Sequence, residues 1–223
     1  MSGKTAAIIG ATGMIGTYLQ QLLLRDGYFS TVRLIVRRPV PKTDPKIEVK
    51  LVNFDDAESV KLALEGTDVL FCAIGTTRKN VKGDKELYRK VDYEIPVKVA
   101  RFCKEAGCEK YVIVSAVGAD SKSGTFYLKL KGEVEDALGA SGLRSVHIME
   151  PSMLLGDRKE YRLMEKILNP PLKLLSALYF GSLRKYKSIH GNTVAKAMVN
   201  VSKKDDPGVF KYTYDGIVQA AQV

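Results

Sequence analysis

The amino-acid sequence predicts an α/β fold built on a doubly wound parallel sheet, and three observations support this prediction. Short apolar runs recur along the chain, and two of them, residues 5–9 and 69–74, end directly before a glycine. Segments in which apolar residues have helical spacing lie between these runs. Strands and helices therefore alternate, as a parallel sheet covered by helices on both faces requires.

The expected elements follow in order along the first two thirds of the chain. Strands are expected over residues 5–9, 32–36, 47–52, 69–74, 111–114 and 145–149. Helices are expected over residues 14–25, 57–64, 84–106 and 123–138. Pro96 marks a break or a new first turn within the third of these helices.

The alternation changes after Pro151. Residues 159–168 have helical spacing, residues 172–180 form an apolar segment that is expected to pack, and residues 209–214 alternate like an edge strand. Asn192 is expected to cap a helix that runs through Val199. We therefore expect a single Rossmann domain over residues 1–223, with a small carboxyl-terminal substrate lobe over about residues 152–223.

Composition narrows the functional classes. The net charge of +10 fits nucleic-acid binding, an anionic small ligand or simply a soluble surface. The basic residues are spread along the chain without a tail or an aromatic repeat, so nucleic acid is disfavoured and a phosphate-rich cofactor is favoured. The three cysteines form no Cys-x-x-Cys, and only two histidines are present, so no metal site is expected.

Two segment-level signals concern membranes and targeting. No stretch approaches 18 uncharged apolar residues, so no transmembrane segment is expected. The first residues lead straight into a strand-like run without a leader pattern, and a cytoplasmic location is the default expectation.

A glycine-rich turn follows the first expected strand. Gly10, Gly13 and Gly16 have the spacing G-x-x-G-x-x-G between a strand and a helix. Glycine allows a tight turn and close approach of a diphosphate, and the helix amino terminus offers free N–H groups. Glycines also end strands for structural reasons, but the strand–turn–helix context favours dinucleotide binding. The residues expected to bind the cofactor in this turn are Gly10, Thr12, Gly13, Met14, Ile15 and Gly16.

The second expected strand ends in Arg37 and Arg38. No acidic residue stands between Asp26 and Asp44, where a carboxylate would bind the ribose 2′-hydroxyl of NAD. Arginine instead favours a 2′-phosphate and can stack on adenine. The alternative is a solvated basic pair at the end of a strand. The pattern favours NADP(H) over NAD(H).

Three residues form a candidate acid–base set. Ser115 follows the fifth expected strand, at the edge of the sheet where ligands bind in this architecture. Tyr127 and Lys131 are four residues apart on the next expected helix and therefore share a face. An ammonium beside a phenol favours the phenolate, which acid–base chemistry by tyrosine requires. A chance occurrence is the alternative, although this is the only Tyr-x-x-x-Lys in the chain.

These motifs, in this order, resemble the short-chain dehydrogenase/reductase superfamily. The glycine spacing and the small lobe resemble its atypical or extended branch, which includes the NAD(P)-binding NmrA-like proteins, and most of all the Tat-interacting-protein-like group. The segments that carry the resemblance are Gly10 to Gly16, Leu34 to Arg38, Phe71 to Arg78, Tyr127 to Glu135 and Leu154 to Arg158.

The resemblance implies roles for individual residues. Tyr127 would donate a proton to a carbonyl, Lys131 would also hold the nicotinamide ribose, and Ser115 would orient the carbonyl. The remaining cofactor contacts that it implies are Asn53, Phe54, Ala73, Ile74, Gly75, Thr76 and Pro151.

Three positions depart from the pattern of these relatives. Asn53 replaces an adenine-facing Asp, Glu150 replaces the Arg of an Arg-Pro-Gly, and Asp92 stands where many members have an active-site Asn. The first departure weakens the adenine assignment, the second alters the charge near the nicotinamide, and the third bears on the proton relay.

The sequence leaves three functions open. The first is an NADP(H)-dependent oxidoreductase that transfers hydride to a carbonyl or conjugated alkene of a small-molecule substrate. The second is a non-catalytic NADP(H) sensor, and the third is a sugar-nucleotide epimerase-like enzyme, for which the last third is short. A homodimer or a protein partner is also compatible with the sequence. Residues considered for the substrate site are Tyr161, Tyr179, Tyr186 and His190.

Overall fold

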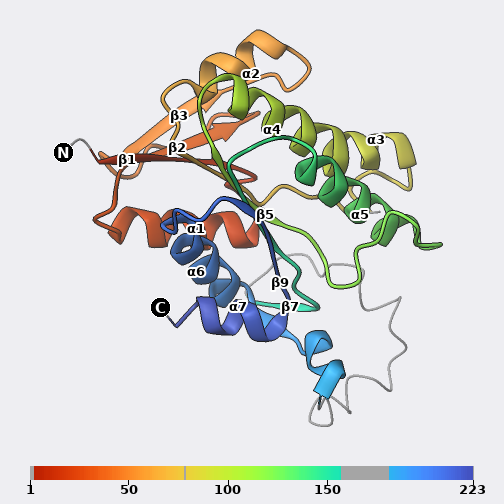
Figure 1. The fold of residues 1–223 in the computed structure, drawn as a ribbon. Helices are drawn as coiled ribbons and strands as arrows, with labels where there is room; N and C mark the ends of the chain where they lie inside the picture. The colour runs from red at the N-terminus through yellow and green to blue at the C-terminus, as the bar shows by residue number, and fades with distance from the viewer. Residues whose placement is uncertain (1–2, 78, 157–180, 223) are drawn as a thin grey trace.

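The computed structural model describes residues 3–77, 79–156 and 181–222, and its centre is a seven-stranded sheet (Figure 1). The strands have the order β3-β2-β1-β4-β5-β6-β9, and every neighbouring pair is parallel. Their bounds are β1 Lys4–Ile9, β2 Phe29–Val36, β3 Ile47–Leu51, β4 Val69–Cys72, β5 Lys110–Val114, β6 Ser145–Met149 and β9 Gly208–Tyr212. The predicted doubly wound parallel sheet is confirmed.

Helices cover both faces of this sheet (Figure 1). One face carries α1 (Met14–Arg25), α6 (Gly191–Ser202) and α7 (Tyr214–Ala220). The other carries α2 (Ala57–Leu64), α4 (Ile95–Glu105) and α5 (Phe126–Gly139). None of the helices among the described residues combines the length and the apolar character needed to cross a bilayer.

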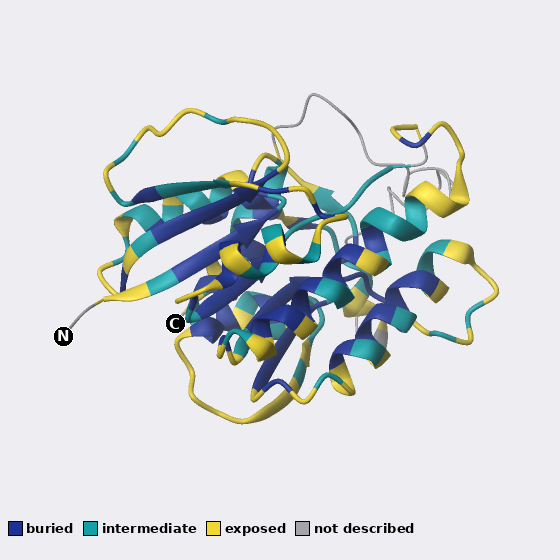
Figure 2. Cartoon of the chain, turned by 90° about the horizontal axis from the view of Figure 1, so that it is seen from above, coloured by how far each residue is buried: buried dark blue, intermediate teal, exposed yellow. Residues whose placement is uncertain are grey.

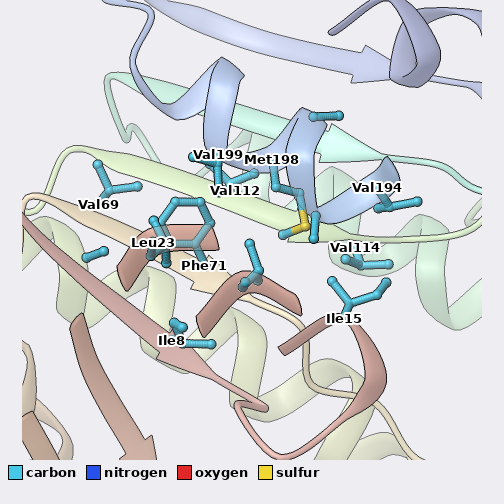
Figure 3. Packing of buried hydrophobic residues seen from close by; sticks show 14 of the residues in the cluster. Ile8, Ile15, Leu23, Val69, Phe71, Val112, Val114, Val194, Met198 and Val199 are labelled. Atoms are coloured by element: carbon cyan, nitrogen blue, oxygen red, sulfur yellow. The ribbon is translucent and has the colours of Figure 1, made fainter. Parts of the chain in front are cut away.

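The core consists of two apolar layers, one on each face of the sheet. Consecutive residues of β1 alternate between them, since Ile8 packs toward α1 and α6 while Ile9 packs toward the opposite helices. Figure 3 shows the first layer, where Phe71 of the sheet lies with Leu23 of α1 and Met198 of α6. Burying each such side chain is worth about 1.5–3 kcal/mol. The inner strands are largely buried, whereas the edge strands β3 and β9 and the outer faces of the helices are partly or fully exposed (Figure 2).

The strand order places a topological switch point between β1 and β4. The chain moves outward from β1 to β2 and β3 in one direction, and from β4 to β5 and β6 in the other. Ligands of open α/β sheets bind outside the carboxyl ends of the strands at such a point. The turn after β1 and the loop after β4 therefore meet at the expected ligand site.

The helix expected over residues 84–106 is divided into three parts. It consists of α3 (Lys85–Arg89), a π-helical segment η1 (Lys90–Glu94) and α4, which has Pro96 in its first turn. The predicted break is confirmed, but it lies in the turn before the proline and takes the form of a π-helix. Elsewhere β2 begins earlier than expected, and α5 begins at Phe126 rather than at residue 123.

The carboxyl-terminal residues combine with the main sheet. β7 (Leu154–Leu155) pairs with β8 (Ile189–His190), and a 3-10 helix η5 (Gly181–Tyr186) precedes β8. The strand expected over residues 209–214 is β9, which lies at the edge of the sheet as predicted. The short helix α7 was not predicted. The segments expected over residues 159–168 and 172–180 lie outside the described residues.

The cap predicted for α6 was wrong. His190, not Asn192, occupies the N-cap position, and its ring nitrogen Nδ1 accepts a hydrogen bond of 3.3 Å from the Asn192 backbone N–H. The reason is that the helix begins at Gly191, one residue before the expected cap.

Candidate active site

The glycine turn joins β1 to α1 with very little space. Gly10 has a φ of +79°, and a side chain there would collide with the backbone of Ala73 and Ile74 after β4. A side chain at Gly16 would overlap the Gly10 carbonyl oxygen and the Ala11 backbone. The Gly13 N–H donates to the Gly10 carbonyl at 3.0 Å. The turn therefore has the tight, side-chain-free shape that a diphosphate needs.

The first turn of α1 provides the donors for such a ligand. Gly13 is the N-cap and has no side chain with which to satisfy the free N–H groups. Thr12 is exposed at the tip of the turn, whereas Ile15 is buried in the core layer shared with α6. The Met14 side chain packs against α6. Its sulfur lies so close to Gly191 that a side chain at Gly191 would overlap it. Met14 and Ile15 would thus serve the cofactor through their backbone.

The basic pair lies at the carboxyl end of β2, beside the glycine turn. Arg37 and Arg38 follow Val36 directly, and both are exposed. Neither forms an ion pair with any residue that the structure describes. Two guanidinium groups are therefore available on the side of the switch point where the adenosine half of a dinucleotide binds.

The residues after β3 are held by local hydrogen bonds. The Asn53 side-chain oxygen accepts from the Asp55 N–H at 3.0 Å, so it stabilises the turn before α2. Phe54 is buried, and its carbonyl accepts from Lys98 Nζ at 3.1 Å. Contact of Asn53 and Phe54 with adenine stays a prediction.

The loop after β4 contacts the π-helical segment. The Ala73 N–H extends the sheet by donating to the Ile9 carbonyl at 3.0 Å. Ile74 and Gly75 follow, and the Thr76 N–H donates to Asp92 Oδ2 at 2.7 Å. Asp92 therefore fixes the loop that was expected to lie beside the cofactor.

Asp92 also holds the candidate lysine. Lys131 Nζ lies 3.2 Å from Asp92 Oδ1, and the side chains are 6% and 2% exposed. The same Nζ lies 6.0 Å from the centre of the Tyr127 ring. The segment η1 turns Asp92 inward, and such π-helical segments occur frequently at functional sites. Tyr127, Lys131 and Asp92 thus form one contiguous group.

Ser115 lies at the end of β5 and takes part in a second group. Its N–H donates to the Met149 carbonyl at 2.7 Å, and its hydroxyl donates to the carboxylate of Glu135. The other Glu135 oxygen lies 2.5 Å from Lys211 Nζ, which is also 3.9 Å from Glu150 Oε1. Sequence reasoning missed Glu135, although its spacing of four from Lys131 places both on one face of α5.

Pro151 lies at the edge of the sheet beside this second group. It is buried, and its carbonyl accepts from the Val117 N–H at 3.1 Å, which joins the ends of β5 and β6. Of the residues considered for the substrate site, Tyr186 is half-buried in η5 and His190 is exposed. Tyr161 and Tyr179 lie outside the described residues.

Family comparison adds to this geometry. A family model described as NAD(P)H-binding matches residues 10–204. Protein FMP52, mitochondrial, from Debaryomyces hansenii is 34% identical over 205 residues, which cover 90% of this chain and 88% of the relative. Protein HTATIP2 from Rattus norvegicus is 32% identical over 207 residues, which cover 90% and 81%. The resemblance to the Tat-interacting-protein-like group is thereby confirmed.

Solved structures support the fold. A putative NAD-dependent epimerase/dehydratase from Bacillus halodurans has a TM-score of 0.70 at 18% identity, with 99% of both chains covered. MoeE5 in complex with UDP-glucose and NAD has a TM-score of 0.69 at 16% identity, with 99% of this chain and 81% of that one covered. At these identities the likeness concerns the fold alone.

The relatives also correct one expectation and assign the family. The predicted cytoplasmic location is wrong, because FMP52 relatives from Debaryomyces hansenii, Eremothecium gossypii and Aspergillus niger are named mitochondrial. That expectation was a default and rested on no positive signal. The glycine turn lies within the matched region, as do Ser115, Tyr127 and Lys131. The chain belongs to the NAD(P)H-binding family, with short-chain dehydrogenase-like epimerases and dehydratases as its structural neighbours.

Proposed function

We propose that this protein is an NADP(H)-dependent oxidoreductase that transfers hydride between the cofactor and a carbonyl or conjugated alkene of a small molecule. The observation that carries the proposal is the group formed by Tyr127, Lys131 and Asp92 at the carboxyl edge of the sheet. Family membership supports the cofactor, and the exposed Arg37 and Arg38 support its 2′-phosphate.

Each part of the site has its own proposed role toward the cofactor or the substrate. The turn from Gly10 to Gly16 would hold the diphosphate, and NADPH would supply hydride when bound. The Tyr127 phenol would donate a proton to the substrate oxygen as negative charge develops on it. Lys131 would stabilise the resulting phenolate, while Asp92 prevents the ammonium from turning away.

Nucleotide binding and turnover test this proposal separately. Purified protein is titrated with NADPH and NADH, and a panel of carbonyl compounds is then added while reduced nicotinamide is followed by absorbance. Tyr127→Phe should reduce turnover by about 10²–10⁴-fold while NADPH binding persists. Tyr28→Phe, a change at an exposed tyrosine outside the site, is the matched control.

The arginine pair tests cofactor choice. Neutral replacements, Arg37→Gln and Arg38→Gln, should weaken NADPH binding more than NADH binding, because only NADPH carries the 2′-phosphate. An equal loss for the two nucleotides would contradict the role of this pair.

A second function, a non-catalytic NADP(H) sensor, is favoured by one specific observation. The single hydroxyl proton of Ser115 is donated to Glu135, so it is not directed at a substrate carbonyl. Tight NADPH binding without turnover of any compound in the panel, unchanged by Tyr127→Phe, would favour the sensor.

A further inference from the structure

A pair of carboxyl groups, Glu135 and Glu150, lies beside Ser115 and near the Lys211 ammonium. The Glu135 side chain is 1% exposed, accepts from the Ser115 hydroxyl and contacts Lys211 Nζ at 2.5 Å. The Glu150 side chain is 12% exposed and reaches the same Nζ only at 3.9 Å. We call Glu135 and Glu150 the carboxyl pair. Among the residues that the structure describes, both members of the pair face the ammonium of Lys211.

The charges around the pair favour one retained proton. Glu135 is a like-charged neighbour of Glu150, and Lys185 of η5 exerts a weaker attraction on Glu150 than Lys211 does. Burial and the charge of Glu135 raise the pKa of Glu150 to about 7. Although its own partial burial opposes it, the hydrogen bond with Glu135 raises the pKa of Lys211, with smaller contributions from Glu150 and Asp136. The ammonium therefore stays charged while the pair gains or loses a proton near neutrality.

The pair lies toward the nicotinamide half of a dinucleotide bound in this fold. With its diphosphate at the Gly10–Gly16 turn and its adenosine beside β2, the ligand extends across the switch point toward β4, β5 and β6. Ser115 directly follows β5, and Glu150 directly follows β6. Glu135 accepts a hydrogen bond from Ser115, so the carboxyl pair lies at the strand ends that the nicotinamide would approach.

We propose that the carboxyl pair releases its proton when the bound nicotinamide is oxidised and regains it when the nicotinamide is reduced, so that pH sets the preference between NADP⁺ and NADPH. This inference rests on the proposed NADP(H) binding. The oxidised ring carries a positive charge that the reduced ring lacks, and a nearby cation favours a carboxylate over a carboxylic acid. Only a proton moves: an O–H bond of the pair breaks, and the proton passes to water beside the half-exposed Lys211.

The direction of the pH effect follows from linkage. If NADP⁺ binding releases a proton, a higher pH favours NADP⁺ binding relative to NADPH binding. A shift of one pKa unit changes the ratio of the two dissociation constants by up to about tenfold across the titration. Both nucleotides carry the same 2′-phosphate, so its own titration cancels from the ratio.

The test is the ratio of dissociation constants, Kd(NADPH)/Kd(NADP⁺), measured by calorimetry between about pH 6 and pH 8. The ratio should rise with pH, by several-fold and at most about tenfold, in the wild-type protein. It should become independent of pH in Glu150→Gln, which has no titrating carboxyl at this position. Glu109→Gln is the matched control, because this exposed residue precedes β5 at the opposite edge of the sheet.

A second variant tests the inference independently, in case Glu150→Gln does not fold. Lys211→Met removes the ammonium while both carboxyl groups remain, so the rise of the ratio should move to higher pH. A pH-independent ratio in the wild type, or an unchanged slope in Glu150→Gln, would overturn the inference and leave the proposed function intact. If neither nucleotide binds to folded protein, the proposed function fails and the inference fails with it. Binding of both with the expected slope but without turnover supports the inference and the sensor function.

Discussion

The Lys131 ammonium forms a buried ion pair with the Asp92 carboxylate. Moving two charges from water to a buried position is costly unless further hydrogen bonds satisfy them. The Thr76 N–H supplies such a bond to the second Asp92 oxygen at 2.7 Å. The ion pair therefore connects the loop after β4 with α5 and gives Lys131 a defined position below Tyr127.

Removing Asp92 should destabilise the protein strongly. Asp92→Ala breaks the buried ion pair with Lys131 and is expected to lower the free energy of unfolding by about 3–5 kcal/mol, measured by urea denaturation. Asp55→Ala, which breaks the exposed pair with Lys90, should have a much smaller effect, because solvent screens exposed charges. Combining Asp92→Ala with Lys131→Met should recover part of the loss. Equal effects of the two aspartate changes would contradict the role of burial.

For individual residues, the sequence predicted contacts only between residues that lie close together in the chain. Tyr127 and Lys131 are one helical turn apart, so their proximity follows from the sequence. Glu135 meets Lys211 across 76 positions, and such a pair leaves no local pattern. The sequence shows that Asp92 and Glu150 depart from related proteins, but only the fold shows which charges they face.

Helix α5 is the element that organises the site. Tyr127, Lys131 and Glu135 lie on one face at intervals of four residues. On another side, Gly132 lies against the backbone of Asp120 and Ser121, where a side chain would overlap both. The closeness of this loop fixes the height of α5 above the sheet, and with it the position of Lys131.

Two glycines in α5 offer a matched test of this packing. Gly132→Ala forces the helix away from rigid backbone atoms and should cost roughly 1–3 kcal/mol of unfolding free energy, with weaker NADPH binding. Gly139→Ala, at the other end of the helix, meets no atom within 4 Å and should be neutral or stabilising by up to about 1 kcal/mol. Thermal unfolding and nucleotide titration measure both effects. Similar losses in the two variants would show that helix propensity, not the loop contact, decides the outcome.

Periodicity predicted the long elements well and the irregular ones poorly. Helix α1 and strand β6 have the predicted bounds, because their apolar residues repeat regularly between clear ends. The π-helical segment η1 widens one helical turn without interrupting the apolar pattern. The sequence therefore gave no sign of it and indicated a break only at the nearby Pro96. Helix α7 has only 7 residues, too few for a distinct helical period.

At the scale of the whole molecule, two buried groups make stability depend on pH in opposite directions. His147 belongs to β6 and packs against β9, with its ring nitrogens 3.0 Å from the Tyr212 hydroxyl and 3.1 Å from Ser145 Oγ. Burial lowers its pKa from 6.5 to about 4, so the unfolded chain binds the extra proton and stability falls as pH drops below 6.5. Burial raises the pKa of Glu150 from 4.5 to about 7, so stability instead falls as pH rises through that range.

These opposite slopes should partly cancel in the range where both groups titrate, from pH 4.5 to pH 6.5. Glu150→Gln removes one of them, so the melting temperature Tm should then fall more steeply as pH decreases through this range. Thermal unfolding at several pH values measures the effect, with Glu109→Gln as the control. Parallel curves for Glu150→Gln and the wild type would contradict the predicted compensation.

The sequence allowed the architecture of the protein to be predicted, but not its location in the cell. Alternating apolar runs and helical spacings are direct consequences of a parallel sheet, so a doubly wound parallel sheet could be predicted, whereas the order of its strands required the fold. Location depends on recognition by other proteins, which no core pattern encodes, and the prediction of a cytoplasmic site accordingly failed. The direct pairing of β9 with β6 also required the fold, because the two strands are far apart in sequence.

The position of β9 has a consequence for how the chain is made. Strand β6 is fully buried in the folded protein, yet its parallel partner Gly208–Tyr212 follows only after β7, β8 and α6. During synthesis, β6 must therefore remain an open edge of the sheet until β9 has left the ribosome. A nascent chain released before Gly208 would expose that edge to its neighbours, and it is in this interval that we expect a need for chaperones.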